Sequence, residues 1–179
     1  MKIGITGHSR GIGKAIFDIL CNDHDCQGFS ISNGFHIRDN QDLIVQAVLK
    51  YDVFINNAYC GLEQVHLLNK VWDYWKKDSS KTIVNISSAS KYTFTNTNGG
   101  GYPAHKAALS DQAFKLMFKD PTRKCRMINV NPGYVKTDRT ARNVNSKMLT
   151  VDECANAVIW AVNQPQHIEI GELSIWRID

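Results

Sequence analysis

The amino-acid sequence predicts an α/β fold in which a doubly wound parallel sheet of about six strands carries helices on both faces. Two observations lead to this prediction. Short apolar runs alternate along the chain with longer segments whose apolar residues recur at helical spacing. A glycine-rich turn, residues 6–13, also separates the first apolar run from the first helical pattern. Because the chain has 179 residues, we expect one domain, 1–179.

The elements can be assigned in chain order. The strands are expected at 2–6, 28–32, 53–56, 82–86, 127–130 and 173–178. The helices are expected at 11–20, 40–50, 61–77, 102–118 and 151–163. In the first helix, Ile12, Ile16 and Ile19 share one face, and Asp39 is the expected N-cap of the second helix. This alternation indicates parallel strands joined by crossover helices.

Composition excludes several classes of protein. Hydrophobic content of 43% and charged content of 21% are ordinary for a globular chain, and no apolar run approaches the length of a membrane span. The net charge of +4 is spread along the sequence, so we expect no nucleic-acid binding and no membrane partner. The five cysteines form no C-x-x-C pair, which predicts reduced thiols and no metal site. The first residues lead directly into a strand, which favours a cytoplasmic location.

The glycine-rich turn has the spacing G-x-x-x-G-x-G. Glycines let a backbone approach a pyrophosphate, and the N–H groups at the start of a helix bind anions. The turn differs from a P-loop, because His8 stands where a glycine is needed and Ala15 follows Lys14. A simpler interpretation is a turn that only lets the helix pack closely on the strand. The candidate ligands in it are Gly7, Ser9, Arg10, Gly11, Ile12 and Gly13.

Tyr102 and Lys106 stand four residues apart at the start of an expected helix, so their side chains share one face. An ammonium group near a phenol favours the phenolate and lowers its pKa. Such a pair suits acid/base chemistry at neutral pH, although a half-buried helix tyrosine would leave the same pattern.

Five motifs occur in the order found in one protein family. They are T-G-x-x-x-G-x-G at 6–13, N-N-A at 56–58, N-I-S-S at 85–88, Y-x-x-x-K at 102–106 and N-P-G-x-V-x-T at 131–137. Together they make the chain resemble a short-chain dehydrogenase/reductase over nearly its whole length. The resemblance implies a Rossmann-like fold and NAD(P)-dependent hydride transfer between nicotinamide and a carbonyl or alcohol.

The resemblance also implies catalytic roles. Tyr102 would be the acid/base, and Lys106 would lower its pKa and bind the nicotinamide ribose. Ser88 would orient the substrate carbonyl. It precedes Tyr102 by one residue more than usual in the family, so Ser90 is a second candidate and Ser87 a weaker one. Asn69 is the only asparagine in the preceding expected helix and is assigned as the fourth catalytic member.

The cofactor is expected to be NADP, with NAD as the alternative. The expected second strand ends in Ser32 and Asn33, neither of which is acidic, and Arg10 could pair with a 2′-phosphate. Beyond the glycine turn, the resemblance assigns to the cofactor Asn33, Asn57, Ala58, Tyr102, Lys106, Pro132, Gly133, Val135 and Thr137.

The chain departs from the family pattern in three places. Residues 33–38 are too few for the crossover helix that should follow the second strand, so that helix is expected to be missing. The substrate lid, 138–149, is short, which implies a small or open pocket. Tyr59 replaces the last glycine of N-N-A-G, where the backbone usually passes close to the cofactor.

Assembly and alternative functions complete the expectations. The helices 61–77 and 102–118 carry more apolar residues than one core needs, which favours a homodimer formed through both. The residues concerned are Trp72, Tyr74, Trp75, Phe114, Leu116, Met117 and Phe118. A redox sensor or scaffold that binds a dinucleotide without turnover is the main alternative. An extended-type epimerase or dehydratase would need a larger carboxy-terminal domain than this chain supplies.

Overall fold

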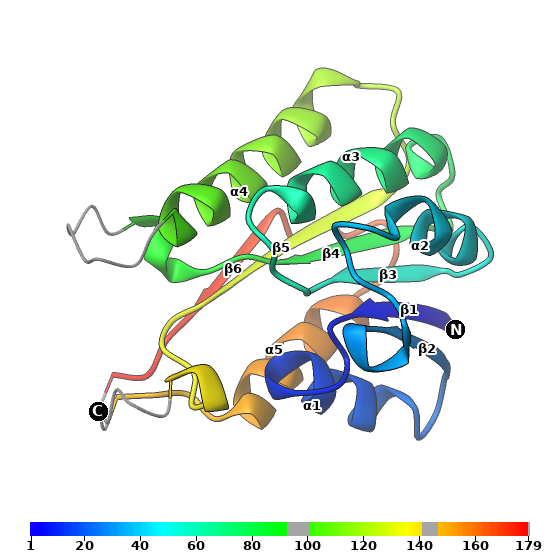
Figure 1. Ribbon diagram of the computed structural model, residues 1–179. Coiled ribbons are helices and arrows are strands. Elements are labelled where there is room, and N and C mark those ends of the chain that lie inside the picture. The colour runs from blue at the N-terminus through cyan, green and yellow to red at the C-terminus, as the bar shows by residue number, and fades with distance from the viewer. Residues whose placement is uncertain (93–100, 141–146, 179) are drawn as a thin grey trace.

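The computed structural model describes residues 1–92, 101–140 and 147–178. Six parallel strands form one sheet in the order β2-β1-β3-β4-β5-β6 (Figure 1). The strands are β1 (Lys2–Thr6), β2 (Asp25–Phe29), β3 (Val53–Asn56), β4 (Thr82–Ile86), β5 (Arg126–Pro132) and β6 (Glu172–Ile175). The predicted fold class and the count of six strands are confirmed for the part of the chain described.

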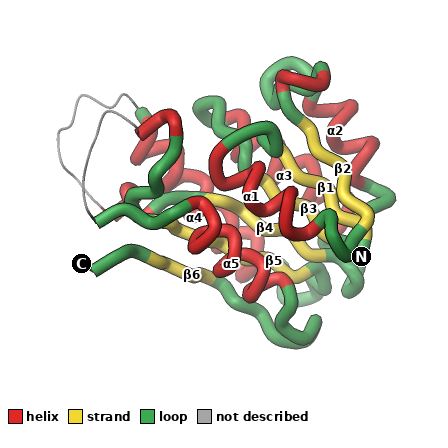
Figure 2. The backbone as a smooth tube through the Cα atoms, turned by 90° about the horizontal axis from the view of Figure 1, so that it is seen from below, coloured by secondary structure: helices red, strands yellow, loops and turns green. Residues whose placement is uncertain are grey.

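Helices cover both faces of the sheet. They are α1 (Gly11–Leu20), α2 (Gln41–Val48), α3 (Glu63–Trp75), α4 (Tyr102–Lys119) and α5 (Val151–Val162). Helices α2, α3 and α4 lie on one face, and α1 and α5 lie side by side on the other (Figures 1 and 2). Each layer shields one side of the central strands from water.

Alternation along the central strands fills two cores. Ile55 and Val84 point toward α1 and α5, whereas Phe54 and Ile83 point toward α3 and α4, and all four side chains are inaccessible to solvent. A strand that is buried on both faces must be apolar at consecutive positions. This requirement explains why β3 and β4 fall where the sequence predicts them, at 53–56 and 82–86.

The second strand was predicted too late in the chain. It occupies Asp25–Phe29, and residues 31–33 form a short 3₁₀ helix instead of continuing the strand. The backbone N–H of Ser30 donates to Asn33 Oδ1 at 2.8 Å, and Gly34 follows with a φ of 86°. This capping turn ends the strand, so Ser32 and Asn33 do not stand at its carboxyl end.

The crossover helix after β2 is missing, as predicted. The chain passes from β2 through the 3₁₀ helix Ile31–Asn33 directly to α2, and β2 is an edge strand beside β1. The expected N-cap was wrong: Asn40 occupies that position without a side-chain capping bond. Asp39 instead binds His36, with 2.9 Å between Oδ2 and Nδ1.

Most other boundaries differ from the prediction by one to three residues. Helices α2, α3 and α5 are shorter than expected and α4 is one residue longer, whereas β5 is longer and β6 ends three residues early. Within the described residues, no helix combines the length and apolarity needed to cross a bilayer. The same residues contain no group of three potential metal ligands.

Candidate active site

The carboxyl ends of β1 and β3 are joined by the hydroxyl of Thr6. Its Oγ1 accepts from the backbone N–H groups of Asn57, at 2.9 Å, and Ala58, at 3.0 Å. The Asn57 amide returns a hydrogen bond to the Thr6 carbonyl at 2.9 Å. The two predicted cofactor residues 57 and 58 are therefore fixed against the start of the glycine turn.

The glycines of the turn serve two different purposes. Gly7 and Gly11 have φ angles of 72° and 57°, which side-chain-bearing residues rarely adopt. Gly13 is required by packing, because a Cβ there would lie 2.3 Å from the Gly7 carbonyl oxygen. Gly7 and Gly11 thus form the bends of the turn and Gly13 its close contact with β1, while pyrophosphate binding stays a prediction.

The amino terminus of α1 suits an anion such as a pyrophosphate. The first hydrogen bond into the helix is donated by Lys14 N to Arg10 O, so the N–H groups of residues 11–13 have no acceptor within the helix. Thr137 lies opposite, and a Cβ on Gly11 would be 3.5 Å from its Cγ2. Ser9 and Arg10, which directly precede the helix, are exposed to solvent. The chain's own groups at this end therefore fit a dinucleotide phosphate.

Asn33, which was predicted to bind the cofactor, uses its side chain to hold the turn that follows β2. Asn33 Nδ2 donates to Gly28 O at 2.8 Å, and its Oδ1 accepts from Ser30 N. The ring of His8 covers the end of the strand, since a Cβ on Gly28 would be 2.1 Å from His8 Cγ. Burial lowers the His8 pKa, and its ring centroid is 4.9 Å from that of Phe17. This histidine contact was not predicted from the sequence.

Tyr102 begins α4, and the side chain of Ser88 acts on its pKa. Burial raises the Tyr102 pKa, while the Ser88 side chain and the charge of Arg139 act in the opposite direction. The expected effect of Lys106 on that pKa is not among the causes. Lys106 Nζ lies 5.7 Å from the centre of the Tyr102 ring, so the two side chains are near neighbours without a direct hydrogen bond.

Lys106 is directed into the protein instead. Its Nζ donates to Gln64 Oε1 at 2.8 Å and to the carbonyl oxygen of Ile86 at 2.7 Å. Only 3% of the residue is exposed, and burial lowers its pKa from 10.5 to about 7, with a smaller contribution from Arg139. An ammonium has three N–H donors, so one remains for a ribose hydroxyl.

Gln64 is a site residue that sequence reasoning missed. Besides accepting from Lys106, it donates through Nε2 to the carbonyl oxygens of Asn56, at 2.6 Å, and Ile86, at 3.2 Å. It is 1% exposed on α3 and shares the buried face with Leu67 and Leu68. Gln64 precedes Leu67 and Leu68 by three and four residues, so a single amide lies on the apolar face of the expected helix. This pattern could have identified it from the sequence.

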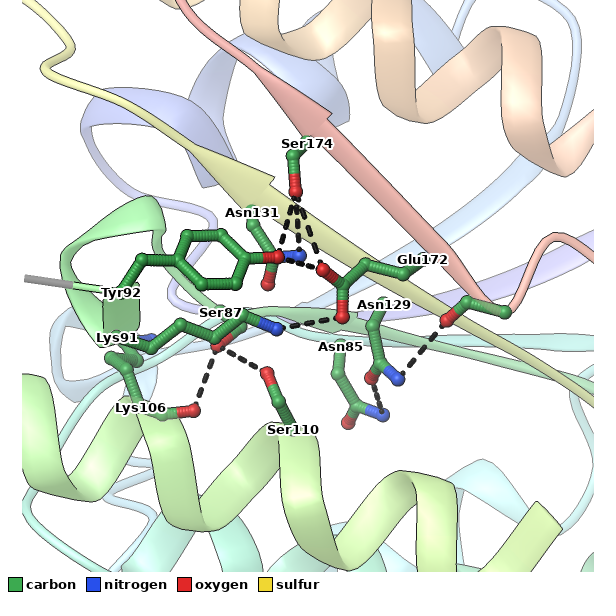
Figure 3. Close-up of polar contacts among 11 residues, drawn as sticks. Asn85, Ser87, Lys91, Tyr92, Lys106, Ser110, Asn129, Asn131, Glu172 and Ser174 are labelled. Atoms are coloured by element: carbon green, nitrogen blue, oxygen red, sulfur yellow. Dashed lines mark hydrogen bonds and ion pairs between the residues drawn. The ribbon is translucent and has the colours of Figure 1, made fainter. Parts of the chain in front are cut away.

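The three candidate serines have different surroundings. Ser88 Oγ accepts from the N–H of Ser90 at 3.1 Å and from its hydroxyl at 2.9 Å, and Ser88 also lowers the pKa of Tyr102. Ser87 donates to the Lys106 carbonyl at 2.9 Å and accepts from Ser110 (Figure 3). Ser88 is therefore the serine in contact with the tyrosine, and Ser87 connects β4 to the backbone of α4.

Asparagines form a buried ladder beneath the site. Asn56 donates to Asn85 and Asn85 to Asn129, each across 3.1 Å, and Asn129 then donates to Gly171 O at 3.2 Å. Figure 3 shows the last two steps. The predicted fourth catalytic member, Asn69, is not brought to this region: its Oδ1 accepts from Gln112 of α4 at 2.6 Å.

The loop after β5 carries the remaining predicted cofactor residues. Pro132 ends the strand, and Gly133 N donates to Ile175 O at 2.7 Å. Val135 is buried and forms an isolated bridge with Leu149. The predicted lid continues from there, and its residues 141–146 lie outside the described part of the chain.

Tyr59 and Arg139 border the predicted catalytic residues. The Tyr59 ring meets Tyr102 edge-on, with 4.8 Å between centroids, and its hydroxyl is 3.0 Å from His105 Nδ1. Lys106 Nζ and Arg139 Cζ each lie 5.4 Å from the centre of the Tyr59 ring. The bulky substitute for the family glycine thus contacts the site directly. Arg139 is a second residue that the sequence analysis did not identify.

A further polar cluster joins the end of β4 to β6. Lys91 Nζ donates to Glu172 Oε2 at 2.7 Å, and the Tyr92 hydroxyl donates to the other oxygen of that carboxylate (Figure 3). Tyr92 also lies 3.2 Å from the hydroxyl of Ser174, which accepts from Asn131 Nδ2. These contacts hold the turn that follows Ser88 against the edge of the sheet.

The parallel sheet, the anion-ready start of α1 and the grouped Ser88, Tyr102 and Lys106 define a Rossmann-type α/β protein with a serine–tyrosine–lysine site. A family model for the short chain dehydrogenases matches residues 63–148. An uncharacterised oxidoreductase of Staphylococcus epidermidis is 31% identical over 222 aligned residues, covering 96% of this chain and 94% of the relative. The chain belongs to the short-chain dehydrogenase family.

Solved structures share the fold. A serine dehydrogenase complexed with NADP+ aligns with a TM-score of 0.79 at 16% identity, covering 98% of this chain and 94% of the other. A 3-ketoacyl-(acyl-carrier-protein) reductase from Brucella melitensis, complexed with NADH, aligns with a TM-score of 0.81 at 18% identity. That alignment covers 97% of this chain and 96% of the reductase.

Proposed function

We propose that the protein is an NADP-dependent oxidoreductase that transfers hydride between nicotinamide and a carbonyl or alcohol, with Tyr102 as the acid/base. The observation that carries this proposal is the grouping of Tyr102 and Ser88, which acts on the Tyr102 pKa, beside the buried Lys106, whose Nζ lies 5.7 Å from the centre of the Tyr102 ring. Two hydroxyls that converge on one point suit the oxygen of a carbonyl or alcohol. The NADP+ and NADH bound in structures of the same fold support a nicotinamide cofactor.

Each residue has a defined part in the reaction. Bound nicotinamide would supply or accept the hydride. During reduction, Ser88 would donate a hydrogen bond to the substrate oxygen, and Tyr102 would give that oxygen its proton as hydride reaches the carbon. The remaining Lys106 N–H would hold a ribose hydroxyl. The hydrogen bond between Thr6 and Asn57 and the start of α1 would hold the phosphates of the cofactor in one position.

The choice of NADP over NAD rests on Arg10. Its side chain is exposed at the edge of the glycine turn and makes no ion pair with any described residue. The segment 30–34 that follows β2 contains no carboxylate to accept from a ribose hydroxyl or to repel a phosphate. A guanidinium in that position favours a 2′-phosphate.

Titration of the purified protein with NADPH and NADH, followed by fluorescence, tests the cofactor. We expect NADPH to bind more tightly, and Arg10→Ala to weaken NADPH binding by about tenfold while NADH binding changes little. Lys14→Ala is the matched control, because Lys14 is an exposed cation on the same helix, paired with Asp18. Equal affinities for both nucleotides would contradict the NADP preference.

A carbonyl panel at saturating NADPH tests the catalytic assignment. Reduction of at least one carbonyl, lost in Tyr102→Phe and unchanged in Tyr74→Phe, is the expected result. Tyr74 is an exposed tyrosine on α3 and controls for a general effect of the substitution. Full activity in Tyr102→Phe would refute the acid/base role.

The dinucleotide-binding sensor or scaffold remains the second candidate, and two observations favour it. The Tyr59 ring lies beside Tyr102, where the family has glycine, and Lys106 is bonded to Gln64. Tight nucleotide binding without turnover of any carbonyl, in both the wild type and Tyr59→Gly, would support this candidate over the enzyme.

A homodimer and a reducing, cytoplasmic setting complete the proposal. On the two helices concerned, Trp72 and Trp75 are buried within this chain, which leaves Tyr74 and Phe118 as the exposed aromatics, at 65% and 76%. These two support an intersubunit contact. Light scattering of the wild type and of Phe118→Glu tests it, and a monomer in both would refute it. The five cysteines are free, as expected of a reducing compartment.

A further inference from the structure

Arg139 stands on a fixed turn. It lies in the 3₁₀ helix Asp138–Thr140, where Thr140 Oγ1 accepts from Thr137 N at 2.9 Å and donates to Val135 O at 2.6 Å. Val135 is itself buried. The backbone that carries the guanidinium is therefore set by hydrogen bonds to the same loop that bears the predicted nicotinamide residues.

The guanidinium lies over an aromatic face next to the catalytic tyrosine. Arg139 Cζ is 5.4 Å from the centre of the Tyr59 ring, which meets Tyr102 edge-on. The bond between the Tyr59 hydroxyl and His105 holds this ring in place. An arginine stacked on a ring keeps its N–H groups free in the plane, ready for a ligand that accepts two of them.

Nothing among the described residues neutralises this charge. Arg139 takes part in none of their ion pairs. The segments 93–100 and 141–146 contain no acidic residue in their sequence. Among the described residues, therefore, no ion pair compensates this cation, which borders a site whose other charged group is Lys106.

The charge of Arg139 also acts on the reaction centre. It lowers the pKa of Tyr102 and that of Lys106. Electrostatic effects of this kind fall off with distance, so the guanidinium is close to the groups that would handle the substrate oxygen. An anion bound to it would lie beside the reacting carbon.

We propose that Arg139, supported by the face of Tyr59, binds a carboxylate of the substrate, so that the enzyme acts on hydroxy acids and oxo acids. The inference rests on the proposed oxidoreductase function and names the substrate class of the same site. A guanidinium recognises a carboxylate through two parallel N–H···O bonds. The substrate would therefore enter with its carboxylate on Arg139 and its carbonyl between Tyr102 and Ser88.

Matched acids and esters provide the kinetic test. Acetoacetate and succinic semialdehyde are compared with their methyl esters at saturating NADPH, and the acid-to-ester ratio of kcat/KM is measured. The ratio cancels any effect of a substitution on the chemical step itself. We expect the wild type to favour an acid by about tenfold or more, Arg139→Met to remove that preference, and Arg139→Lys to restore part of it. Lys136→Met, which removes an exposed cation from the same loop, should keep the wild-type ratio.

A binding experiment separates this inference from the proposed function. Calorimetric titration with butyrate and with butyramide, with and without NADPH, measures the carboxylate preference in the absence of turnover. Butyrate is expected to bind about tenfold more tightly than butyramide in the wild type and equally in Arg139→Met. Failure of the oxidoreductase proposal would abolish turnover of acids and esters alike but leave this difference.

Three results would overturn the carboxylate subsite. One is an acid-to-ester ratio near unity in the wild type together with equal binding of butyrate and butyramide. Another is a wild-type preference that persists in Arg139→Met. The last is a loss of NADPH affinity in Arg139→Met as large as the loss of the acid preference, which would make Arg139 a cofactor ligand.

Discussion

Lys106 should make the stability of this protein depend on pH in a range where few other groups act. Burial lowers its pKa from 10.5 to about 7, so the unfolded chain holds the proton more tightly than the folded protein. Between those two values the unfolded state binds more protons, and stability therefore rises with pH. Below about pH 7 Lys106 is protonated in both states, and the full cost of burying its charge lowers the stability.

The magnitude follows from the shift of the pKa. Between pH 7 and pH 9 the folded protein releases the Lys106 proton while the unfolded chain keeps it, which raises the free energy of unfolding by about 2 kcal/mol. Burial also raises the pKa of three thiols from 9.0 to about 12; they are Cys26, Cys125 and Cys154. Their destabilising effect begins as the pH approaches 9 and offsets part of the gain, but it is common to the wild type and a Lys106 variant, so the difference between the two isolates Lys106. The lowered pKa of His8 acts below pH 7.

Urea unfolding at pH 7, 8 and 9 measures the effect, with fluorescence of the buried Trp72 and Trp75 as the probe. We expect the free energy of unfolding of the wild type to rise by about 2 kcal/mol relative to that of Lys106→Met over this range. Lys115→Met, which removes an exposed lysine from the same helix, should follow the wild type. If the wild type and Lys106→Met have parallel profiles, Lys106 titrates in the folded protein as it does in water, and the reasoning fails.

Three further predictions concern the residues around the site. Gly13→Ala places a methyl 2.3 Å from Gly7 O, so we expect a loss of about 3 kcal/mol or more and of NADPH affinity. Gly171→Ala, with nothing nearer than 3.6 Å, should stay within about 1 kcal/mol in the same denaturation assay. Thr6→Val leaves two backbone N–H groups without their acceptor and should lose about 2 kcal/mol by urea unfolding, with Thr6→Ser near the wild type. Gln64→Glu places a carboxylate beside the lysine ammonium and raises its pKa, so stability should no longer rise between pH 7 and 9; an unchanged slope would refute the contact.

The fold was predictable where burial dictates composition. Strands β3 and β4 are covered on both faces, so their apolar runs mark them at 53–56 and 82–86 without ambiguity. The missing crossover followed from chain length alone, because residues 33–38 cannot span a parallel connection. Strand β2 was predicted three residues too late because it is an edge strand whose sequence, DCQGF, is only partly buried.

Site residues that belong to sequence motifs could be predicted. Those that reach the site only through tertiary contacts could not. Tyr102, Lys106 and Ser88 could be named from spacing and resemblance, and the structure brings them together. The partner of Lys106 could not be named, because Gln64 lies 42 residues away and meets it only through the packing of α3 against α4. Arg139 likewise reaches the site by a turn whose geometry depends on hydrogen bonds within its own loop.

The two cations near Tyr102, Lys106 and Arg139, would respond differently to pH. Lys106 is buried and has a pKa of about 7, so its charge changes within the range of neutral solutions. Guanidinium groups in general do not lose their proton in this pH range. Proton transfer, which depends on the field at Tyr102, would therefore vary with pH through Lys106. Capture of a substrate carboxylate by Arg139 would not vary, so the acid-to-ester preference should stay constant from pH 7 to 9 while kcat changes.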